Sequence, residues 1–246
     1  MTEKFIAEMV GTAILVILGD GVVANVLLAK SKAQNSGWIV ITAGFGFAVM
    51  VGVYVAGAVS GGHINPAVTL GVLITNPTFG IDTAVWYFAG QFIGAFLGGV
   101  VVYLHFLPHW AETENADLKL AAFSTAPAIR NTVANLLSEI IGTFVLVLGI
   151  FGITAGVNNV GPLAALLIGF LVFGIGLSLG GTTGFALNPA RDFGPRVAHF
   201  ILPIAGKRDS DWSYSWIPVV GPLIGGALGA LVYQALFTNF ALKIVS

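Results

Sequence analysis

The sequence contains no cysteine and few charged residues. Without cysteine the chain can form neither a disulfide nor a thiolate metal site, and thiol catalysis is excluded. Charged residues make up 9% of the 246 residues, whereas a soluble domain carries about 25%. The formal net charge of -1 also provides no basic face for nucleic acid. The scarcity of charge therefore argues against a soluble protein and against a nucleic-acid partner.

Hydrophobic residues make up 57% of the chain and gather in long runs. Six runs reach the length of about 20 residues that a membrane-spanning helix needs; they are residues 5–29, 38–59, 84–107, 133–155, 161–179 and 217–240. The first run is longer than the apolar core of a signal peptide, so we expect it to remain as a membrane helix. We therefore expect an all-α membrane protein in a lipid bilayer, with residues 108–130 as its longest polar loop.

Two further apolar segments are too short to cross a bilayer. They run from Asn65 to about Thr75 and from Asn188 to about His199. At about 1.5 Å per residue, each covers about half of a bilayer core that is about 30 Å thick. Each segment begins with Asn-Pro-Ala, formed by Asn65, Pro66 and Ala67 in the first and by Asn188, Pro189 and Ala190 in the second. Because asparagine is a favoured N-cap and proline a favoured first helical residue, both triplets predict helix starts.

The chain also contains an internal repeat. Phe5-Ile-Ala-Glu-Met-Val-Gly-Thr is similar to Leu136-Leu-Ser-Glu-Ile-Ile-Gly-Thr, so that Glu8 matches Glu139, 131 residues later. The two triplets lie 123 residues apart, and the glycine-rich segments that begin at Gly90 and Gly221 lie 131 apart. Each copy holds three spans and one half span, and since three is odd, the second copy is inverted in the membrane. We expect one channel domain over residues 1–246, with a first inverted repeat (1–107), a connecting loop (108–130) and a second repeat (131–246).

Inverted repeats place the two Asn-Pro-Ala helix starts face to face near the middle of the bilayer. Their helix dipoles and asparagine N–H groups attract the oxygen of water or an alcohol, repel cations and interrupt a proton-conducting chain of waters. The irregular loops before the triplets offer backbone carbonyls as acceptors, since irregular backbone at membrane depth is tolerated along a cavity. The expected carbonyls belong to Gly61, Gly62, His63 and Ile64 on one side and to Gly184, Phe185, Ala186 and Leu187 on the other.

Several ionisable residues lie at membrane depth. Arg191 falls in the first turn of the second half-helix; unpaired arginine there costs at least about 2.5 kcal/mol, so we expect it either to present donors at the constriction or to snorkel to the interface. Asp192 is expected to fix local geometry. Glu8 and Glu139 are expected to accept hydrogen bonds from the loops before the half-helices, with a proton relay as the alternative. His63 is expected to be a hydrogen-bonded loop residue, with a pH gate as the alternative.

The segments Gly62-His-Ile-Asn-Pro-Ala-Val-Thr and Gly184-Phe-Ala-Leu-Asn-Pro-Ala-Arg-Asp-Phe-Gly-Pro resemble the paired signatures of the major intrinsic proteins, the aquaporin and glycerol-facilitator family. The resemblance extends from Ile6 to about Gln234. It implies a homotetramer in the plasma membrane, one pore per subunit, passive flow and cytoplasmic termini. That topology puts five basic residues outside, namely Lys30, Lys32, Lys119, Lys207 and Arg208, whereas the positive-inside rule would choose the opposite orientation.

The resemblance also implies a constriction made by Phe45, Gly176, Phe185 and Arg191. Water-selective members usually carry histidine where this chain has Gly176, so a wider opening is expected. Two aromatic faces opposite arginine donors suit a polyol, and Asp192 and Arg196 are similar to glycerol-branch markers, although Phe45 replaces a common tryptophan.

The expected solutes are glycerol, water and small uncharged molecules such as neutral lactic acid, dihydroxyacetone and urea. No metal, cofactor or enzymatic activity is expected, since no histidine has metal-ligand spacing and no His-Glu-x-x-His or Gly-x-Ser-x-Gly motif occurs. A water-selective channel, an ion-coupled transporter and a non-transporting membrane scaffold are the competing hypotheses.

Overall fold

The computed structural model describes residues 1–158 and 160–238. Within them, six helices are long and apolar enough to cross a membrane. They are α1 (Thr2–Leu27), α2 (Trp38–Ser60), α4 (Ile81–His105), α7 (Thr132–Thr154), α8 (Ala164–Leu179, preceded by a 3-10 turn at Gly161–Leu163) and α10 (Ile217–Tyr233, continued by a π-helical turn at Gln234–Thr238). The six predicted spans are confirmed, with ends that differ by a few residues; the last two residues of the predicted 217–240 span lie outside the described residues.

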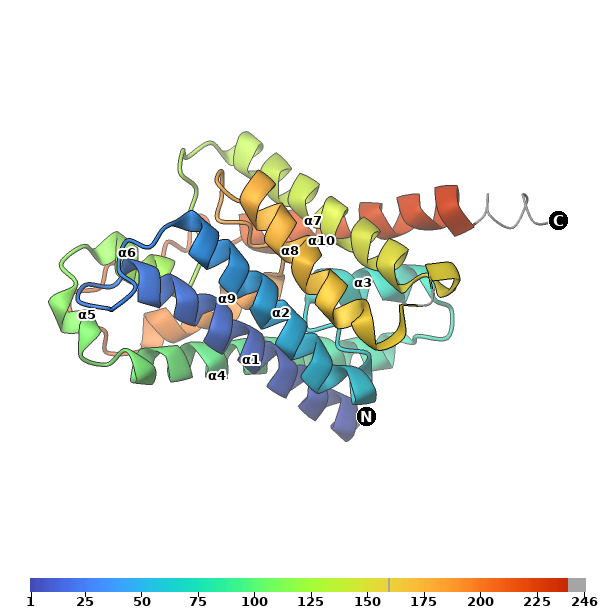
Figure 1. Ribbon diagram of the computed structural model, residues 1–246, viewed down its shortest axis with the longest axis horizontal. Coiled ribbons are helices and arrows are strands. Elements are labelled where there is room, and N and C mark those ends of the chain that lie inside the picture. Colours follow the sequence, from blue (N-terminus) through green and yellow to red (C-terminus); the bar gives the residue numbers. More distant parts are fainter. Residues whose placement is uncertain (159, 239–246) are drawn as a thin grey trace.

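Two shorter helices, α3 (Pro66–Thr75) and α9 (Pro189–Ile201), begin at the Asn-Pro-Ala triplets. They lie between the long helices, α3 toward the end of the molecule where the chain begins and α9 toward the opposite end (Figure 1). Helix α9 continues two residues beyond the predicted end. The Lys207 ammonium donates to the carbonyls of His199, Phe200 and Leu202 at 2.6, 2.8 and 2.7 Å, and a cation there satisfies the free carbonyls of a helix C-terminus.

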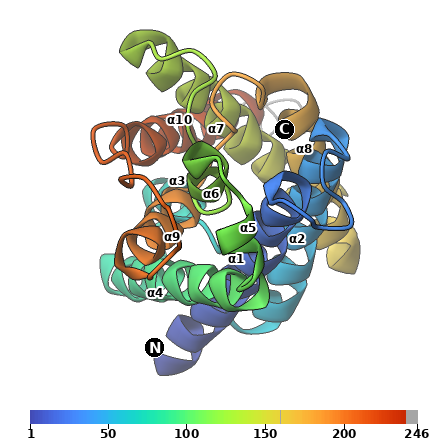
Figure 2. The same ribbon diagram turned by 90° about the vertical axis from the view of Figure 1, so that its left-hand side faces the viewer.

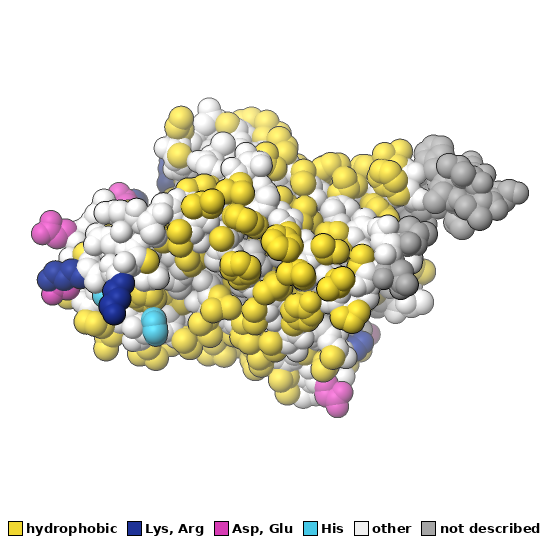
Figure 3. All heavy atoms as spheres, viewed as in Figure 1, with side chains coloured by type: hydrophobic (Ala, Val, Ile, Leu, Met, Phe, Trp, Pro, Cys, Tyr) yellow, Lys and Arg dark blue, Asp and Glu magenta, His cyan; other side chains and the backbone are white. Residues whose placement is uncertain are grey.

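The ends of the bundle differ in character from its middle. Helix α1 begins and α10 ends at one end, while the short helices α5 (His109–Glu112) and α6 (Ala116–Ala121) lie at the other (Figure 1). Hydrophobic side chains cover the middle of the face in Figure 3, and the charged side chains visible there lie at the two ends. This distribution fits a protein whose middle faces lipid and whose ends face water.

Close glycine contacts join the same helices in each half. A methyl group added at Gly98 of α4 would lie 2.8 Å from the Ala13 carbonyl oxygen of α1. One added at Gly229 of α10 would lie 2.6 Å from the Phe144 carbonyl oxygen of α7. Gly229 follows Gly98 by 131 residues and Phe144 follows Ala13 by 131 residues, the same separation as between Glu8 and Glu139. The duplication visible in the sequence is therefore also present in the packing, where small residues let helix backbones approach.

A second contact joins one half to the other. A methyl group added at Gly46 of α2 would lie 2.8 Å from the Gly169 carbonyl oxygen of α8, and one added at Gly169 would lie 2.7 Å from the Gly46 carbonyl oxygen. These two residues are 123 positions apart, as are the two triplets. Because the contact is reciprocal, α2 and α8 cross at equivalent points, as expected for inverted halves related by a two-fold axis in the membrane plane.

The connecting loop 108–130, expected as the longest polar loop, is partly buried. It contains α5 and α6, and its Trp110 and Phe123 are buried in a cluster with Phe106 and Ile204. Even Lys119 is 3% exposed and donates to the Ala205 carbonyl. Viewed along the bundle, α5 and α6 lie over the centre of this end (Figure 2). The aromatic residues between the charges explain the difference, because each supplies a large apolar area that packing removes from water.

Candidate functional site

The two short helices begin against each other in the centre of the bundle. The Asn65 side-chain oxygen accepts from the Ala67 N–H at 2.8 Å, and the Asn188 oxygen accepts from the N–H groups of Ala190 and Arg191 at 3.0 and 3.2 Å. With proline at the first helical position, both triplets have the N-cap geometry expected from the sequence. The capped oxygens leave the amide N–H groups of both asparagines to face the opposite half.

Each asparagine amide binds the loop of the other repeat. Asn65 Nδ2 donates to the Leu187 carbonyl at 2.9 Å, and Asn188 Nδ2 donates to the Ile64 carbonyl at 2.8 Å. One N–H of each amide therefore binds a backbone carbonyl of the protein, so that not every amide N–H is available to the solute. The second N–H remains, because an amide carries two, and both asparagines line the central cavity.

The loops before the triplets adopt unusual backbone conformations. Ile64, Phe185 and Leu187 have φ angles of 43°, 40° and 56°, in a region that side chains with a Cβ seldom occupy. Gly62 and Gly184 also have positive φ, at 67° and 83°, which costs glycine little. Such strain persists only where surrounding contacts fix it.

Two buried carboxylates fix these loops. Glu8 accepts from the N–H groups of His63 and Ile64 at 3.0 and 2.6 Å. Glu139 accepts from the N–H groups of Ala186 and Leu187, both at 3.0 Å. Both glutamates are 0% exposed, and the hydrogen bonds expected from the sequence are present. Because buried charges need such partners, the backbone N–H groups stabilise the buried carboxylates, and the carboxylates in turn fix the conformation of the loops.

His63 also has internal partners. Its Nδ1 lies 3.1 Å from the Thr69 hydroxyl, and its ring packs against those of Phe79 and Tyr87 at centroid distances of 5.3 and 4.9 Å. These contacts match the hydrogen-bonded loop residue expected from the sequence.

A cavity of about 260 Å³ runs along these loops. Its lining includes residues of both loops and the two asparagines, together with aliphatic residues such as Leu15, Val49, Ile150 and Val172. Of the residues predicted to line the pore, the wall includes Phe45, Gly61, Gly62, His63, Ile64, Asn65, Phe185, Ala186, Leu187, Asn188 and Arg191. Within residues 1–158 and 160–238, no group of three His, Asp or Glu side chains could hold a metal ion.

Three of the four predicted constriction residues meet on the cavity wall. The rings of Phe45 and Phe185 lie edge to face, with centroids 5.3 Å apart and planes at 75°. The Arg191 guanidinium carbon lies 4.6 Å from the Phe45 ring centroid, within the range of a cation–π contact. The two aromatic rings and the arginine are therefore packed together on the cavity wall.

Gly176 does not take the expected place on the wall. A methyl group there would lie 2.8 Å from Thr42 Cγ2 and 3.1 Å from Phe185 Cζ, and its carbonyl accepts from Trp38 Nε1 at 3.0 Å. The absence of a side chain at Gly176 thus makes room for Thr42 and Phe185 rather than for solute. Gly184 is also absent from the wall of the described cavity, and a methyl group added there would lie 3.4 Å from Thr125 Cγ2.

Sequence reasoning missed two residues next to the constriction. Asp20 of α1 is 0% exposed, and its Oδ1 lies 3.5 Å from Arg191 Nη1. The Trp38 ring packs edge to face on Phe185, with centroids 5.7 Å apart. An aspartate within an apolar span is a signal in itself, since such charges are costly in a membrane, whereas nothing in the local sequence distinguishes Trp38 from an interfacial tryptophan.

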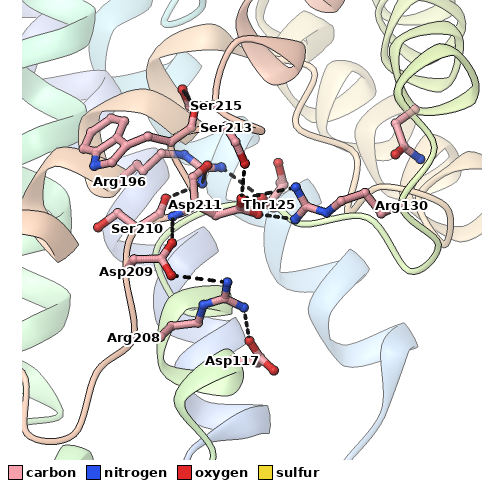
Figure 4. A network of polar contacts seen from close by, with 12 residues as sticks. Asp117, Thr125, Arg130, Arg196, Arg208, Asp209, Ser210, Asp211, Ser213 and Ser215 are labelled. Atoms are coloured by element: carbon pink, nitrogen blue, oxygen red, sulfur yellow. Dashed lines mark hydrogen bonds and ion pairs between the residues drawn. The ribbon is translucent and has the colours of Figure 1, made fainter.

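Asp192, in the first turn of α9, is the centre of a buried network. Its carboxylate accepts from the Thr125 N–H and hydroxyl at 2.7 and 2.6 Å and from Arg196 Nε at 2.8 Å. Arg196 also donates to the carbonyls of Thr125 and Ser210 at 2.9 and 2.8 Å. The network ties the 108–130 and 206–215 loops to the half-helix that carries Arg191 (Figure 4), in keeping with the structural role expected for Asp192.

The same network reaches the water-exposed surface through Asp211. This carboxylate pairs with the Arg130 guanidinium and accepts from the Ser213 hydroxyl at 3.0 Å (Figure 4). Partial burial raises the pKa of Asp211, but the hydrogen bonds from Arg130 and Ser213 outweigh it, so that the pKa lies below its ordinary value. Asp211 is therefore held in its charged form at neutral pH.

Comparison with known proteins agrees with this geometry. Residues 1–233 match the family model of the major intrinsic proteins. The chain is 60% identical to the probable glycerol uptake facilitator protein of Thermotoga maritima, over 95% of this chain and 99% of that protein. It is 53% identical to glycerol uptake facilitator protein 3 of Lactiplantibacillus plantarum, over 95% and 96%. The aquaglyceroporin structure from Plasmodium falciparum superposes with a TM-score of 0.88 at 28% identity, over 98% of this chain and 99% of that one. The chain belongs to the major intrinsic protein family, a family of membrane channels.

Proposed function

We propose that the protein is a passive channel for glycerol and similar small uncharged solutes, together with water, in the plasma membrane. The observation that carries this proposal is the placement of Phe45, Phe185 and Arg191 on one cavity wall. Glycerol has an apolar carbon edge and a polar hydroxyl edge, which match the aromatic faces and the guanidinium. The names of the relatives from Thermotoga maritima and Lactiplantibacillus plantarum support this choice over a water-selective channel.

The cavity supplies both partners that a hydroxyl group needs. A solute oxygen accepts from Arg191 and from the free amide N–H groups of Asn65 and Asn188, while its hydrogen donates to the loop carbonyls. The carbon chain meanwhile moves along the aliphatic side chains that line the cavity. A cation is repelled by the partial positive charge of the two helix N-termini, so it is held back. Transport needs no covalent step.

Solute flux in purified vesicles tests the proposal. Vesicles that contain the protein should shrink in hyperosmotic glycerol and then reswell faster than empty vesicles. Rapid shrinking without faster reswelling would support a water-selective channel and contradict the proposal. The same assay with dihydroxyacetone, urea and lactic acid at acidic pH defines the range of solutes.

An ion-coupled transporter and a membrane scaffold would each behave differently from a passive channel. Glu8 and Glu139 hold backbone N–H groups of the two loops, so we expect glycerol flux to be insensitive to a pH gradient or membrane potential. A flux driven by either gradient would favour an ion-coupled transporter. Loss of flux in Asn188→Asp, with unchanged assembly, would argue against a scaffold without transport, because a carboxylate cannot donate to the Ile64 carbonyl or to a solute oxygen.

We further propose that the channel is a homotetramer with cytoplasmic termini. Many large apolar side chains of the long helices are exposed in the single chain, among them Phe47 on α2 and Phe170 on α8, and neighbouring subunits or lipid can cover them. Native mass measurement in lipid particles tests the tetramer. Tryptic cleavage at the exposed Arg130 tests the orientation, and cleavage only from the cytoplasmic side would contradict it.

A further inference from the structure

A carboxylate is buried directly behind the constriction. Asp20 is 0% exposed, and its Oδ1 lies 3.5 Å from Arg191 Nη1. Within the described residues, neither oxygen of Asp20 has a hydrogen-bond partner, and neither do Nε and Nη1 of Arg191. A buried carboxylate without hydrogen bonds is expensive unless an opposite charge compensates it. The guanidinium is the group that does so here.

Helix α1 comes close enough to act on the constriction because of the residue before Asp20. A methyl group at Gly19 would lie 2.8 Å from Phe45 Cδ1, so only a glycine lets α1 pack against this ring. Arg191 then contacts the Phe45 ring and the Asp20 carboxylate. The nearby Asp192 carboxylate is already bound by Arg196 and Thr125. Asp20 is thus placed to balance the charge of Arg191.

We propose that Asp20 is the counterion of the constriction arginine and makes the channel select neutral solutes over small anions. The inference rests on the proposed function, since it concerns the same pore. Two helix N-termini already give the centre of the cavity a positive potential, and an uncompensated guanidinium would add a full charge that attracts anions. Asp20 cancels that charge without forming a hydrogen bond to the guanidinium. Asp20 is absent from the cavity wall, so it acts through Arg191 as a positioning residue.

Iodide influx into vesicles tests this role. The vesicles contain an iodide-quenched dye and a potassium ionophore that carries the compensating charge. We expect Asp20→Asn, which keeps the shape of the side chain and removes its charge, to raise iodide influx by about tenfold or more, since at an effective dielectric constant of about 20 an uncompensated charge several ångströms away changes anion partitioning by more than that factor. Asp82→Asn removes a carboxylate from the exposed start of α4 and should leave iodide influx unchanged.

A double variant separates charge from structure. In Asp20→Asn combined with Arg191→Gln, both charges are gone, and iodide influx should fall back to within about threefold of the wild-type value, because the two effects act on one pair. If the double variant leaks iodide as much as Asp20→Asn alone, the leak comes from altered packing and the proposal is overturned. Unchanged iodide influx in Asp20→Asn overturns it as well.

Glycerol reswelling of the wild-type vesicles and assembly of the variants are measured as well, so that failure of the proposed function can be distinguished from failure of the role of Asp20. Glycerol reswelling of the wild-type vesicles is recorded first, and its absence refutes the proposed function, whereas reswelling together with unchanged anion influx refutes only the role of Asp20. If Asp20→Asn and Asp20→Ser both fail to assemble while the double variant assembles, the pair serves charge balance in folding rather than selectivity. That result also overturns the proposal.

Discussion

Replacing Glu8 by glutamine tests how the first loop is held in its strained conformation. The carboxylate accepts four hydrogen bonds, from the Ser60 hydroxyl at 2.5 Å, the His63 N–H at 3.0 Å, the Ile64 N–H at 2.6 Å and Gln91 Nε2 at 2.7 Å. Glutamine offers one oxygen and one NH₂ group. If the oxygen stays with Ser60 and His63, the NH₂ group faces the donors of Ile64 and Gln91.

The size of the loss follows from which donor can adjust. Gln91 can rotate its amide, because its side-chain oxygen has no hydrogen-bond partner within the described residues. That rotation gives up the 2.9 Å bond from Gln91 Nε2 to Thr69, which costs about 0.5–1.5 kcal/mol. The Ile64 N–H cannot adjust, and a lost hydrogen bond to a charged group costs about 1.5–3 kcal/mol. Glu8→Gln should therefore destabilise the protein by about 2–4.5 kcal/mol.

Thermal unfolding and flux measure the effect. A loss of that size should lower the unfolding midpoint by about 4–18 °C, and glycerol flux should fall because Ile64 also carries the carbonyl that positions Asn188. Glu114→Gln, in an exposed loop, is the control and should change neither quantity. An unchanged midpoint with unchanged flux in Glu8→Gln would refute this account of the loop. An unchanged midpoint together with the loss of a pH dependence that the wild-type flux shows would favour the proton relay instead.

Three further predictions concern packing, the constriction and the surface network. Gly229→Ala should impair assembly or lower the unfolding midpoint, because its methyl group would lie 2.6 Å from the Phe144 carbonyl oxygen. The control Gly57→Ala in α2, with open space around it, should change neither assembly nor the midpoint. Equal effects of the two substitutions would contradict close packing as the cause. Gly176→His should reduce glycerol flux more than water flux by pushing Phe185 into the cavity, and adding Thr42→Ala should restore part of it; undiminished glycerol flux would show that Phe185 does not set the width. Asp211→Asn should be less stable than the wild type at neutral pH. Because the folded pKa of Asp211 lies below its ordinary value of 3.8, its contribution is present above that pH and is lost as the pH falls further, so the two unfolding midpoints should converge in acid; a constant gap would show that the carboxylate charge is not the cause.

The features that the sequence predicts well are those that occur twice. The triplets, the matched glutamates and the glycine-rich segments recur in each half, and repetition distinguishes a polar residue with a structural partner from a chance one. The N-caps of Asn65 and Asn188 follow from local chemistry alone. The backbone hydrogen bonds of Glu8 and Glu139 follow from the cost of burying a carboxylate.

The features that sequence reasoning misses occur once or depend on distant contacts. Asp20 has no counterpart in the second half, since Phe151 occupies the matching position. The burial of Trp110 and Phe123 depends on α1, α9 and the residues after α9, which no local pattern reveals. The contact of Gly176 with Thr42 and Phe185 could not be predicted either, because the direction in which a helical glycine faces depends on how its helix is rotated.

The crossed hydrogen bonds of the two asparagines have a consequence for the origin and reassembly of the chain. Asn65 satisfies the Leu187 carbonyl and Asn188 satisfies the Ile64 carbonyl, so neither repeat completes its own loop. A half-length ancestor could have met the same need only by pairing with a second copy inserted in the opposite direction, which requires a peptide without strong orientation preference. In the present chain, the basic residues of the loops favour the orientation opposite to the proposed topology, so charge does not fix the orientation, which fits that requirement. Separate fragments, cut in the 108–130 loop and produced together, should therefore find each other in the membrane, while either fragment alone should be degraded.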